Sequence, residues 1–290
     1  MTKISLLLLT TLLALGWFPA RTTQQNSANK TPQENISFSD GSVAYLGTTF
    51  KYDRGLASEV KAQTIEASLA SAREPAPYDT IFPRHIAFEL VGTYAAQPAS
   101  FIKPDIRVYP LRAYEKAFAA DRKARREVVA TINRMRQILR SRSLPLKGDL
   151  PSLPIPDGYY AFRAHTAFLR FDNGTGVVFL TQGQQDEMPV NNQNLSYEFQ
   201  GITDDGRFYV TAEFPVAAPF LAYDRDKANY GAVVKEASCY QCADHRRFMQ
   251  EYRAYVSKVQ EQLEKLRPEE FQPSLKSFDD LVKSIKVTKQ

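Results

Sequence analysis

The two cysteines of the chain, Cys239 and Cys242, are separated by two residues, and His245 follows three positions after the second. Thiol and imidazole groups at this spacing could hold a metal, form a redox couple or form a structural disulfide. Covalent haem attachment needs a histidine directly after the second cysteine, where Ala243 stands, so it is excluded. A structural zinc site would need a fourth ligand from a distant histidine or carboxylate. We therefore predict no metal and no cofactor.

The alternatives that remain for Cys239 and Cys242 are a disulfide and a thiol oxidoreductase site. A thioredoxin-like couple needs strands after the cysteine pair, but the 48 residues that follow Cys242 (290 − 242) have a helical pattern. We predict a disulfide, formed in an oxidising compartment, that anchors the start of the following helix. The loop that it closes is small, so it restricts the unfolded chain only slightly.

Residues 1–20 have the features of a bacterial export signal. The apolar run at 4–18 is long for a signal core and short for a transmembrane helix. Ala20 suits a cleavage site but Phe18 does not, so an uncleaved membrane anchor is the alternative. Trp17 stands where a lipoprotein carries its lipidated cysteine, which excludes thioether lipidation. We predict a secreted or periplasmic protein.

Behind the signal, residues 21–35 are polar and lack apolar periodicity, which predicts a disordered linker. Residues 36–290 are predicted to form a single domain, because 43% hydrophobic residues are ample for a core. The formal net charge of +5 is only mildly basic. Together with export, this excludes nucleic acid as a partner.

The clearest structural signal lies between residues 160 and 215. Two pairs of strand-like runs are joined by Asn173-Gly174 and by Asp205-Gly206. Asn-Gly between β-rich runs predicts a type I′ hairpin turn, which needs positive φ at both central residues. The pattern predicts four strands in an antiparallel meander.

Other elements are predicted by alternation or by helical periodicity. Strands are expected near 50–53, 59–68, 85–92 and 105–110, and one long helix over 112–141. A second long helix precedes Pro268, and a short helix and an edge strand close the chain. The expected buried stripe of the first helix is Val128, Ile132, Met135 and Leu139; that of the second is Phe248, Tyr252, Tyr255, Val259, Leu263 and Leu266.

These elements predict an α+β fold, with an antiparallel sheet covered by long amphipathic helices. The helices could cover one face of the sheet or both, and the second case would be an α/β/α sandwich.

The stretch "GTGVVFLTQGQQDEMPVNNQNLSYEFQGITDDGRFYVTAEFPV", residues 174–216, resembles a family of secreted bacterial proteins, often lipoproteins, to which no function is assigned. The resemblance implies a fold loosely similar to the PsbP/Mog1 type and no catalytic residues to transfer. The chain departs from the family in lacking the lipidated cysteine. The matching residues are Asn173, Gly174, Gly176, 179–182, Asn191, Asn192, Leu195, Tyr197, 199–201 and 203–206.

Amide side chains cluster where two meander strands connect. Gln182, Asn191, Asn192 and Gln200 could form a rim that binds a ligand, because amides both donate and accept hydrogen bonds. The alternative is that they satisfy backbone groups of the loop.

Arginines gather on the outer face of the helix at 112–141, which could contact the phosphates of an anionic membrane. The ordinary interpretation is a solvated helix exterior. A membrane contact is therefore expected only through this weak interaction or through an uncleaved signal.

No phosphate-binding loop, zinc-protease motif, serine-hydrolase elbow or calcium loop occurs in the sequence. We therefore predict a non-enzymatic binding domain of the cell envelope, with a glycan, peptide or protein as its ligand. The alternative is an envelope enzyme, either a thiol oxidoreductase or a hydrolase whose carboxylates converge only in three dimensions.

Overall fold

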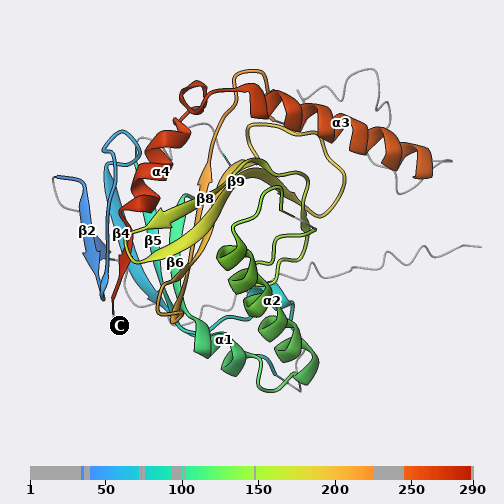
Figure 1. Cartoon of the computed structure of the whole chain (residues 1–290). Coiled ribbons are helices and arrows are strands. Elements are labelled where there is room, and N and C mark those ends of the chain that lie inside the picture. The colour runs from blue at the N-terminus through green and yellow to red at the C-terminus, as the bar shows by residue number, and fades with distance from the viewer. Residues whose placement is uncertain are drawn as a thin grey trace, which may run out of the picture.

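A computed structural model describes most of the chain beyond residue 40 (Figure 1). The predicted signal, most of the predicted linker, Cys239 and Cys242 lie outside the described residues. The described residues are 34–35, 40–71, 73, 76–92, 100, 102–146, 148–224 and 245–288.

The largest element of the described chain is an antiparallel sheet of nine strands. Its order is β1-β4-β5-β6-β11-β10-β9-β7, and β8 also pairs with β9. The last two residues of the predicted linker are β1, which pairs with β4. The strands are β1 (Glu34–Asn35), β4 (Glu59–Ile65), β5 (His85–Val91), β6 (Asp105–Pro110), β7 (Tyr159–Tyr160), β8 (Ala164–Phe171), β9 (Gly174–Gln184), β10 (Leu195–Thr203) and β11 (Phe208–Pro215).

A smaller sheet has the order β12-β3-β2 and joins the two ends of the described chain. The predicted closing edge strand is β12 (Lys286–Val287), and it pairs with β3 (Thr48–Lys51). The other neighbour of β3 is β2 (Ser42–Tyr45).

The predicted meander is confirmed as β8-β9-β10-β11, but the type I′ turn is wrong. Phe171 pairs with Gly174, so the central residues of the first turn are Asp172 and Asn173. Neither has positive φ. Gly174 is instead the first residue of β9, where a Cβ would lie 2.6 Å from the carbonyl oxygen of Ile202. Close packing, and not turn geometry, therefore requires this glycine.

The predicted helix over 112–141 is two helices. α1 (Leu111–Ala117) and α2 (Arg122–Ser141) are separated because Asp121 caps a new N-terminus. Its Oδ1 accepts hydrogen bonds from the N–H groups of Lys123 and Ala124, at 2.9 and 3.0 Å. The predicted stripe of α2 is confirmed as buried.

The C-terminal helices are α3 (His245–Lys265) and α4 (Leu275–Lys283), and two short 3₁₀ helices span Tyr78–Thr80 and Pro268–Glu270. Val256 of α3 is buried, whereas Tyr255 of α3 and Leu266, which directly follows α3, are only half-buried. The other members of the predicted stripe are buried.

Helices cover both faces of the main sheet. One face packs against α3, α4 and the smaller sheet in a large apolar core. The other packs against α1 and α2 through Tyr109, Tyr209 and Ile202 (Figure 1). The α+β prediction is therefore confirmed. This second face also carries Val177 and Phe179, which pack against Leu150 of the crossover, and the polar side chains of Glu198 and Glu213.

Candidate functional site

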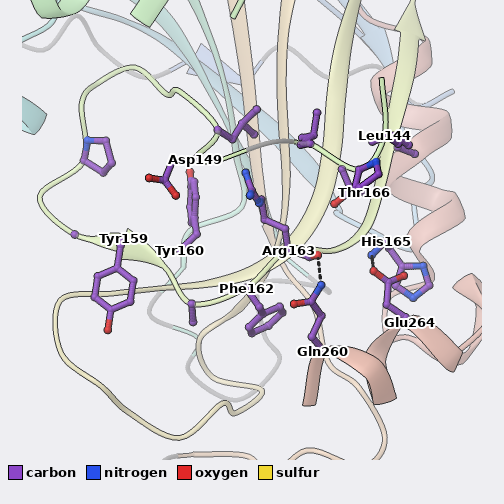
Figure 2. Close-up of a pocket in the computed structure, with 17 residues that line it drawn as sticks. Leu144, Asp149, Tyr159, Tyr160, Phe162, Arg163, His165, Thr166, Gln260 and Glu264 are labelled. Carbon is purple, nitrogen blue, oxygen red and sulfur yellow. Dashed lines mark hydrogen bonds between the residues drawn. The ribbon is translucent and has the colours of Figure 1, made fainter. Parts of the chain in front are cut away.

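A cleft of about 940 Å³ lies beside the β7 end of the main sheet (Figure 2). Three segments line it: the proline-rich crossover within 144–156, the sheet edge within 158–167, and the α3 residues Gln260 and Glu264. This volume is at the upper end of the range of small-molecule sites. The cleft can therefore hold several residues of an extended chain.

The backbone of β7 lines the cleft with its unpaired side. Among the residues that the structure describes, β7 pairs only with β9, and the N–H of Ala161 extends the pairing by donating to the carbonyl oxygen of Gln182 at 3.0 Å. In an antiparallel pair, backbone groups alternate between facing the partner strand and facing away. Since Ala161 faces β9, the N–H and C=O of Tyr160 point away from it, on the side of the cleft.

Farther along this edge, α3 occupies the backbone groups. The side-chain amide of Gln260 donates to the carbonyl oxygen of Arg163 at 2.9 Å, and Glu264 accepts from the N–H of His165 at 3.1 Å. The His165 Nε2 lies 2.8 Å from the carbonyl oxygen of Leu263. Of the described edge, the backbone groups that remain available to a ligand are therefore those that precede Arg163 in the sequence.

His165 also interrupts the strand. Its φ is +50°, and the register with β9 shifts between Ala164 and Ala167. Such a bulge re-aims side chains and ends regular pairing. The bulge lies near the start of β8, beside the cleft that His165 lines.

The cleft lining combines apolar and charged groups. The exposed Leu144 and the half-buried Leu146 supply apolar surface, whereas Leu150 and Phe162 are buried. The Arg163 guanidinium donates to the carbonyl oxygen of Gly148 at 2.7 Å and holds the crossover. Asp149 is exposed. This combination suits a ligand that has apolar side chains and a polar backbone.

Two amides of the predicted ligand-binding rim are together but inaccessible. Gln182 and Asn191 have no exposed surface. The Oε1 of Gln182 accepts from the N–H of Asn191 at 3.1 Å, and both side chains donate to the carbonyl oxygen of Pro189, at 3.2 and 2.9 Å. These amides satisfy the loop backbone.

The other two predicted rim residues lie elsewhere. The half-buried Asn192 donates to the carbonyl oxygens of Ala218 and Leu221 at 3.1 and 3.0 Å, and accepts from the N–H of Ala218 at 2.8 Å. Gln200 is buried on the opposite face of the sheet, where its Oε1 accepts from the hydroxyl of Tyr209 at 3.1 Å. The structure therefore does not gather the four amides into one rim.

A row of carboxylates crosses the polar face of the sheet. Glu89 is opposite Asp105, Asp105 is opposite Glu213, and Glu213 is opposite Glu198, on four adjacent strands. Residues opposite each other have Cβ atoms about 5 Å apart, and like charges so placed are destabilising. Arg107 offsets part of this charge by binding Asp105 at 2.7 Å.

The carboxyl groups of this row have raised pKa values. Burial, followed by the charge of Asp105, raises the pKa of Glu213 to about 7. Burial and the neighbouring Glu213 raise the pKa of Glu198 well above its usual value, although Ser196 donates to its Oε1 at 2.9 Å. Both shifts favour the protonated form of the pair, and raised carboxyl pKa values are a feature of general acid–base sites.

Our sequence reasoning missed this carboxylate pair, although a signal was available. The turn after β10 pairs Ile202 with Tyr209, and the same register places Glu198 opposite Glu213. Both glutamates interrupt hydrophobic strands, which makes them unusual. Their neighbour Asp105 could not be found this way, because β6 pairs with β11 across a long stretch of sequence.

The predicted disulfide of Cys239 and Cys242 lies outside the described residues and stays a prediction. Within the described part of the chain, no group of histidine, cysteine or carboxylate side chains is arranged to hold a metal ion. The same part contains no helix both long and apolar enough to cross a membrane.

Comparison with family models, with curated proteins and with solved structures found no match to this chain.

Proposed function

We propose that the protein is exported to the cell envelope and acts there by binding, with an extended peptide segment as the ligand of the cleft. The observation that carries the proposal is the unpaired edge of β7, which lies within the cleft lining. The sequence-based prediction of export agrees with a role outside the cytoplasm.

A peptide added to a sheet edge gains backbone hydrogen bonds, and pockets beside the edge select its side chains. Here the N–H and C=O of Tyr160 supply the backbone groups. Leu144 and Leu146 supply apolar surface in the same cleft lining. A compact ligand without an extended backbone would not form hydrogen bonds with the N–H and C=O of Tyr160.

The test uses a phage library of unstructured decapeptides, followed by titration of an enriched synthetic peptide. Tyr160→Pro removes the outward N–H, and proline is tolerated at a sheet edge when its nitrogen faces outward. Tyr160→Ala removes the same ring but keeps the N–H. We expect the proline variant to bind about fivefold more weakly than the alanine variant, as the loss of one hydrogen bond of about 1 kcal/mol predicts.

The result that contradicts the proposal is equal affinity of the two variants, because edge pairing would then contribute nothing. Failure to enrich any peptide would contradict it as well. Circular dichroism of both variants establishes that each is folded.

A second candidate function, hydrolysis, is favoured by the Glu198–Glu213 pair. Two neighbouring carboxyl groups that share a proton can serve as acid and base in the cleavage of a glycoside or peptide bond. The carboxyl group of Glu213 makes no hydrogen bond with any described residue, so its proton is not held by a partner within the described protein. No redox cofactor or metal ion is needed for this chemistry.

Chromogenic glycosides and dye-labelled peptides test this second function. We expect Glu198→Gln and Glu213→Gln each to abolish turnover. The exposed Glu261→Gln on α3 is the matched control and should leave turnover unchanged. Turnover that survives both substitutions would exclude the pair as the catalytic groups.

A further inference from the structure

Three arginines converge where α2 ends beside the turn between β10 and β11. Arg136, Arg140 and Arg142 line a pocket of about 470 Å³ together with Thr175 and Thr203. The arginines come from the last two turns of α2 and from its C-cap, and the threonines from β9 and β10. A helix and a sheet thus build the pocket jointly.

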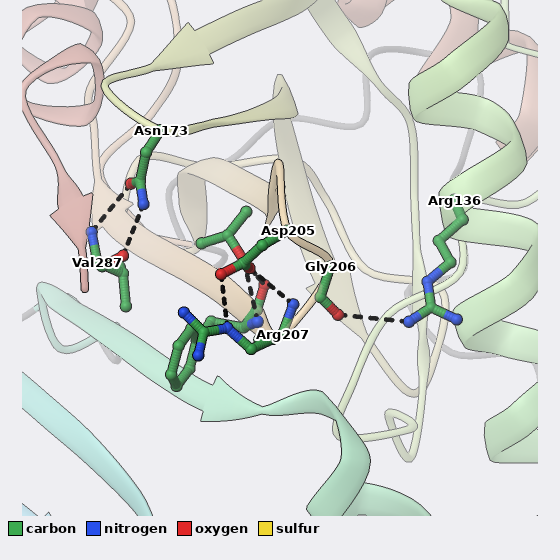
Figure 3. Close-up of polar contacts among 8 residues, drawn as sticks. Arg136, Asn173, Asp205, Gly206, Arg207 and Val287 are labelled. Carbon is green, nitrogen blue, oxygen red and sulfur yellow. Dashed lines mark hydrogen bonds and ion pairs between the residues drawn. The ribbon is translucent and has the colours of Figure 1, made fainter. Parts of the chain in front are cut away.

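Two of the guanidinium groups reach from α2 to the sheet. Arg136 Nη2 donates to the carbonyl oxygen of Gly206 at 3.4 Å, and Arg142 Nη2 donates to Thr175 Oγ1 at 3.1 Å (Figure 3 shows the first contact). A guanidinium carries five N–H donors. Most donors of both side chains are therefore unused, and Arg140 makes no side-chain hydrogen bond to any described residue.

None of the three arginines has a carboxylate partner among the described residues. Asp204 also lines the pocket, and its carboxylate pairs with Arg170 at 2.9 Å. Asp205 is also engaged, because its side chain accepts from Thr203 at 2.7 Å and pairs with Arg207. The pocket thus contains three positive charges that the described protein does not neutralise.

We propose that this arginine pocket binds an oxyanion of phosphate or sulfate chemistry, either as the free anion or as an ester. Guanidinium groups bind such oxyanions through paired hydrogen bonds, and threonine hydroxyl groups donate as well. Cations near a helix C-terminus also stabilise the helix dipole. That role does not require Arg136 and Arg142 to extend to the sheet.

A second depression of about 610 Å³ adjoins the arginine pocket and shares Arg136 and Arg140 with it. Asn133, Gln137 and Ser141 complete its lining. Polar, uncharged groups next to an anion site suit the hydroxyl groups of a headgroup or sugar that carries the phosphate. The ligand can therefore extend beyond the anion itself.

Calorimetric titration of the folded protein tests the site, with inorganic phosphate in one arm and vesicles in the other. The vesicles contain phosphatidylcholine alone or with phosphatidylglycerol. The pocket variant is R136Q/R140Q/R142Q. The matched control is R122Q/K123Q/R126Q, which removes the same charge from exposed positions at the other end of α2.

We expect binding that weakens with salt, falls about tenfold or more in the pocket variant and stays within about twofold in the control. R140Q alone should weaken binding severalfold, and it disturbs no contact within the described protein. Saturable binding of inorganic phosphate would show that a free anion is a sufficient ligand for the pocket. Binding of phosphatidylglycerol vesicles without binding of inorganic phosphate would show that the ligand is a lipid headgroup.

Equal losses in the pocket variant and the control would overturn the proposal, because only overall charge would then matter. Absence of binding in both arms would overturn it as well.

Discussion

The side-chain amide of Asn173 forms two hydrogen bonds with the backbone of Val287. Its Nδ2 donates to the carbonyl oxygen at 2.6 Å, and its Oδ1 accepts from the N–H at 3.0 Å (Figure 3). The side chain pairs with β12 as a neighbouring strand would. Since Asn173 belongs to the turn between β8 and β9, it connects the meander to the smaller sheet.

Asn173→Ala should therefore lower the free energy of unfolding by about 1–3 kcal/mol, because both groups of Val287 lose their partner. Urea denaturation measures the change, and hydrogen exchange should show faster exchange at the Val287 amide. The exposed Asn133→Ala on α2 is the control. A change of less than about 0.5 kcal/mol for Asn173→Ala would mean that water replaces the amide without loss.

Two glycines of β9 should respond differently to alanine. A Cβ on Gly176 would lie 2.2 Å from the ring of Phe199 and 2.5 Å from the carbonyl oxygen of Gln200, whereas a Cβ on Gly183 meets nothing within 4 Å. We expect Gly176→Ala to destabilise the fold by about 1–3 kcal/mol or more. Gly183→Ala should be neutral or slightly stabilising, by less than about 1 kcal/mol. Thermal unfolding of both variants distinguishes these outcomes, and similar midpoints would contradict the packing.

The buried amide of Gln182 should contribute to stability. Gln182→Ala leaves the N–H of Asn191 without its acceptor, for which we expect a loss of about 1–3 kcal/mol. The exposed Gln185, whose amide contacts Asp157, is the control, and its alanine variant should change stability by less than about 0.5 kcal/mol. Equal chemical denaturation curves for the two variants would show that burial of Gln182 is unimportant.

Glu213 should make stability depend on pH in a defined direction. Its pKa is about 7 in the folded protein, against an ordinary value of 4.5. Between these values the folded state retains a proton that the unfolded state has lost. The stabilising contribution of Glu213 to the free energy of unfolding is therefore fully present below pH 4.5. It is lost as the pH rises through 7.

Glu213→Gln removes this dependence, since glutamine stays neutral. We expect the variant to be more stable than the parent at pH 8 and similar to it at pH 4.5, as measured by thermal unfolding. The exposed Glu261→Gln should show no such difference. A Glu213→Gln variant that is less stable at pH 8 would indicate that the ionised carboxylate has a favourable partner.

Local patterns determined the elements of this protein that sequence alone could predict. The meander was predictable because alternating residues and turn residues specify a hairpin between neighbouring strands. The buried stripe of α2, including Val128 and Ile132, was predictable because an amphipathic helix must bury its apolar face. The break before Arg122 was missed, although Asp121 is an ordinary capping residue.

Only the tertiary structure decided which side chains meet. Asp105 joins Glu213 because β6 pairs with β11, and pairing between distant strands depends on the packing of the whole sheet. Gln182 is buried because the loop after β9 folds over it. A polar residue gives no indication of such burial in the sequence. The cleft and the arginine pocket each combine segments that are separate in sequence. Local physical chemistry specifies strands, turns and helix faces, whereas long-range packing determines where functional groups come together.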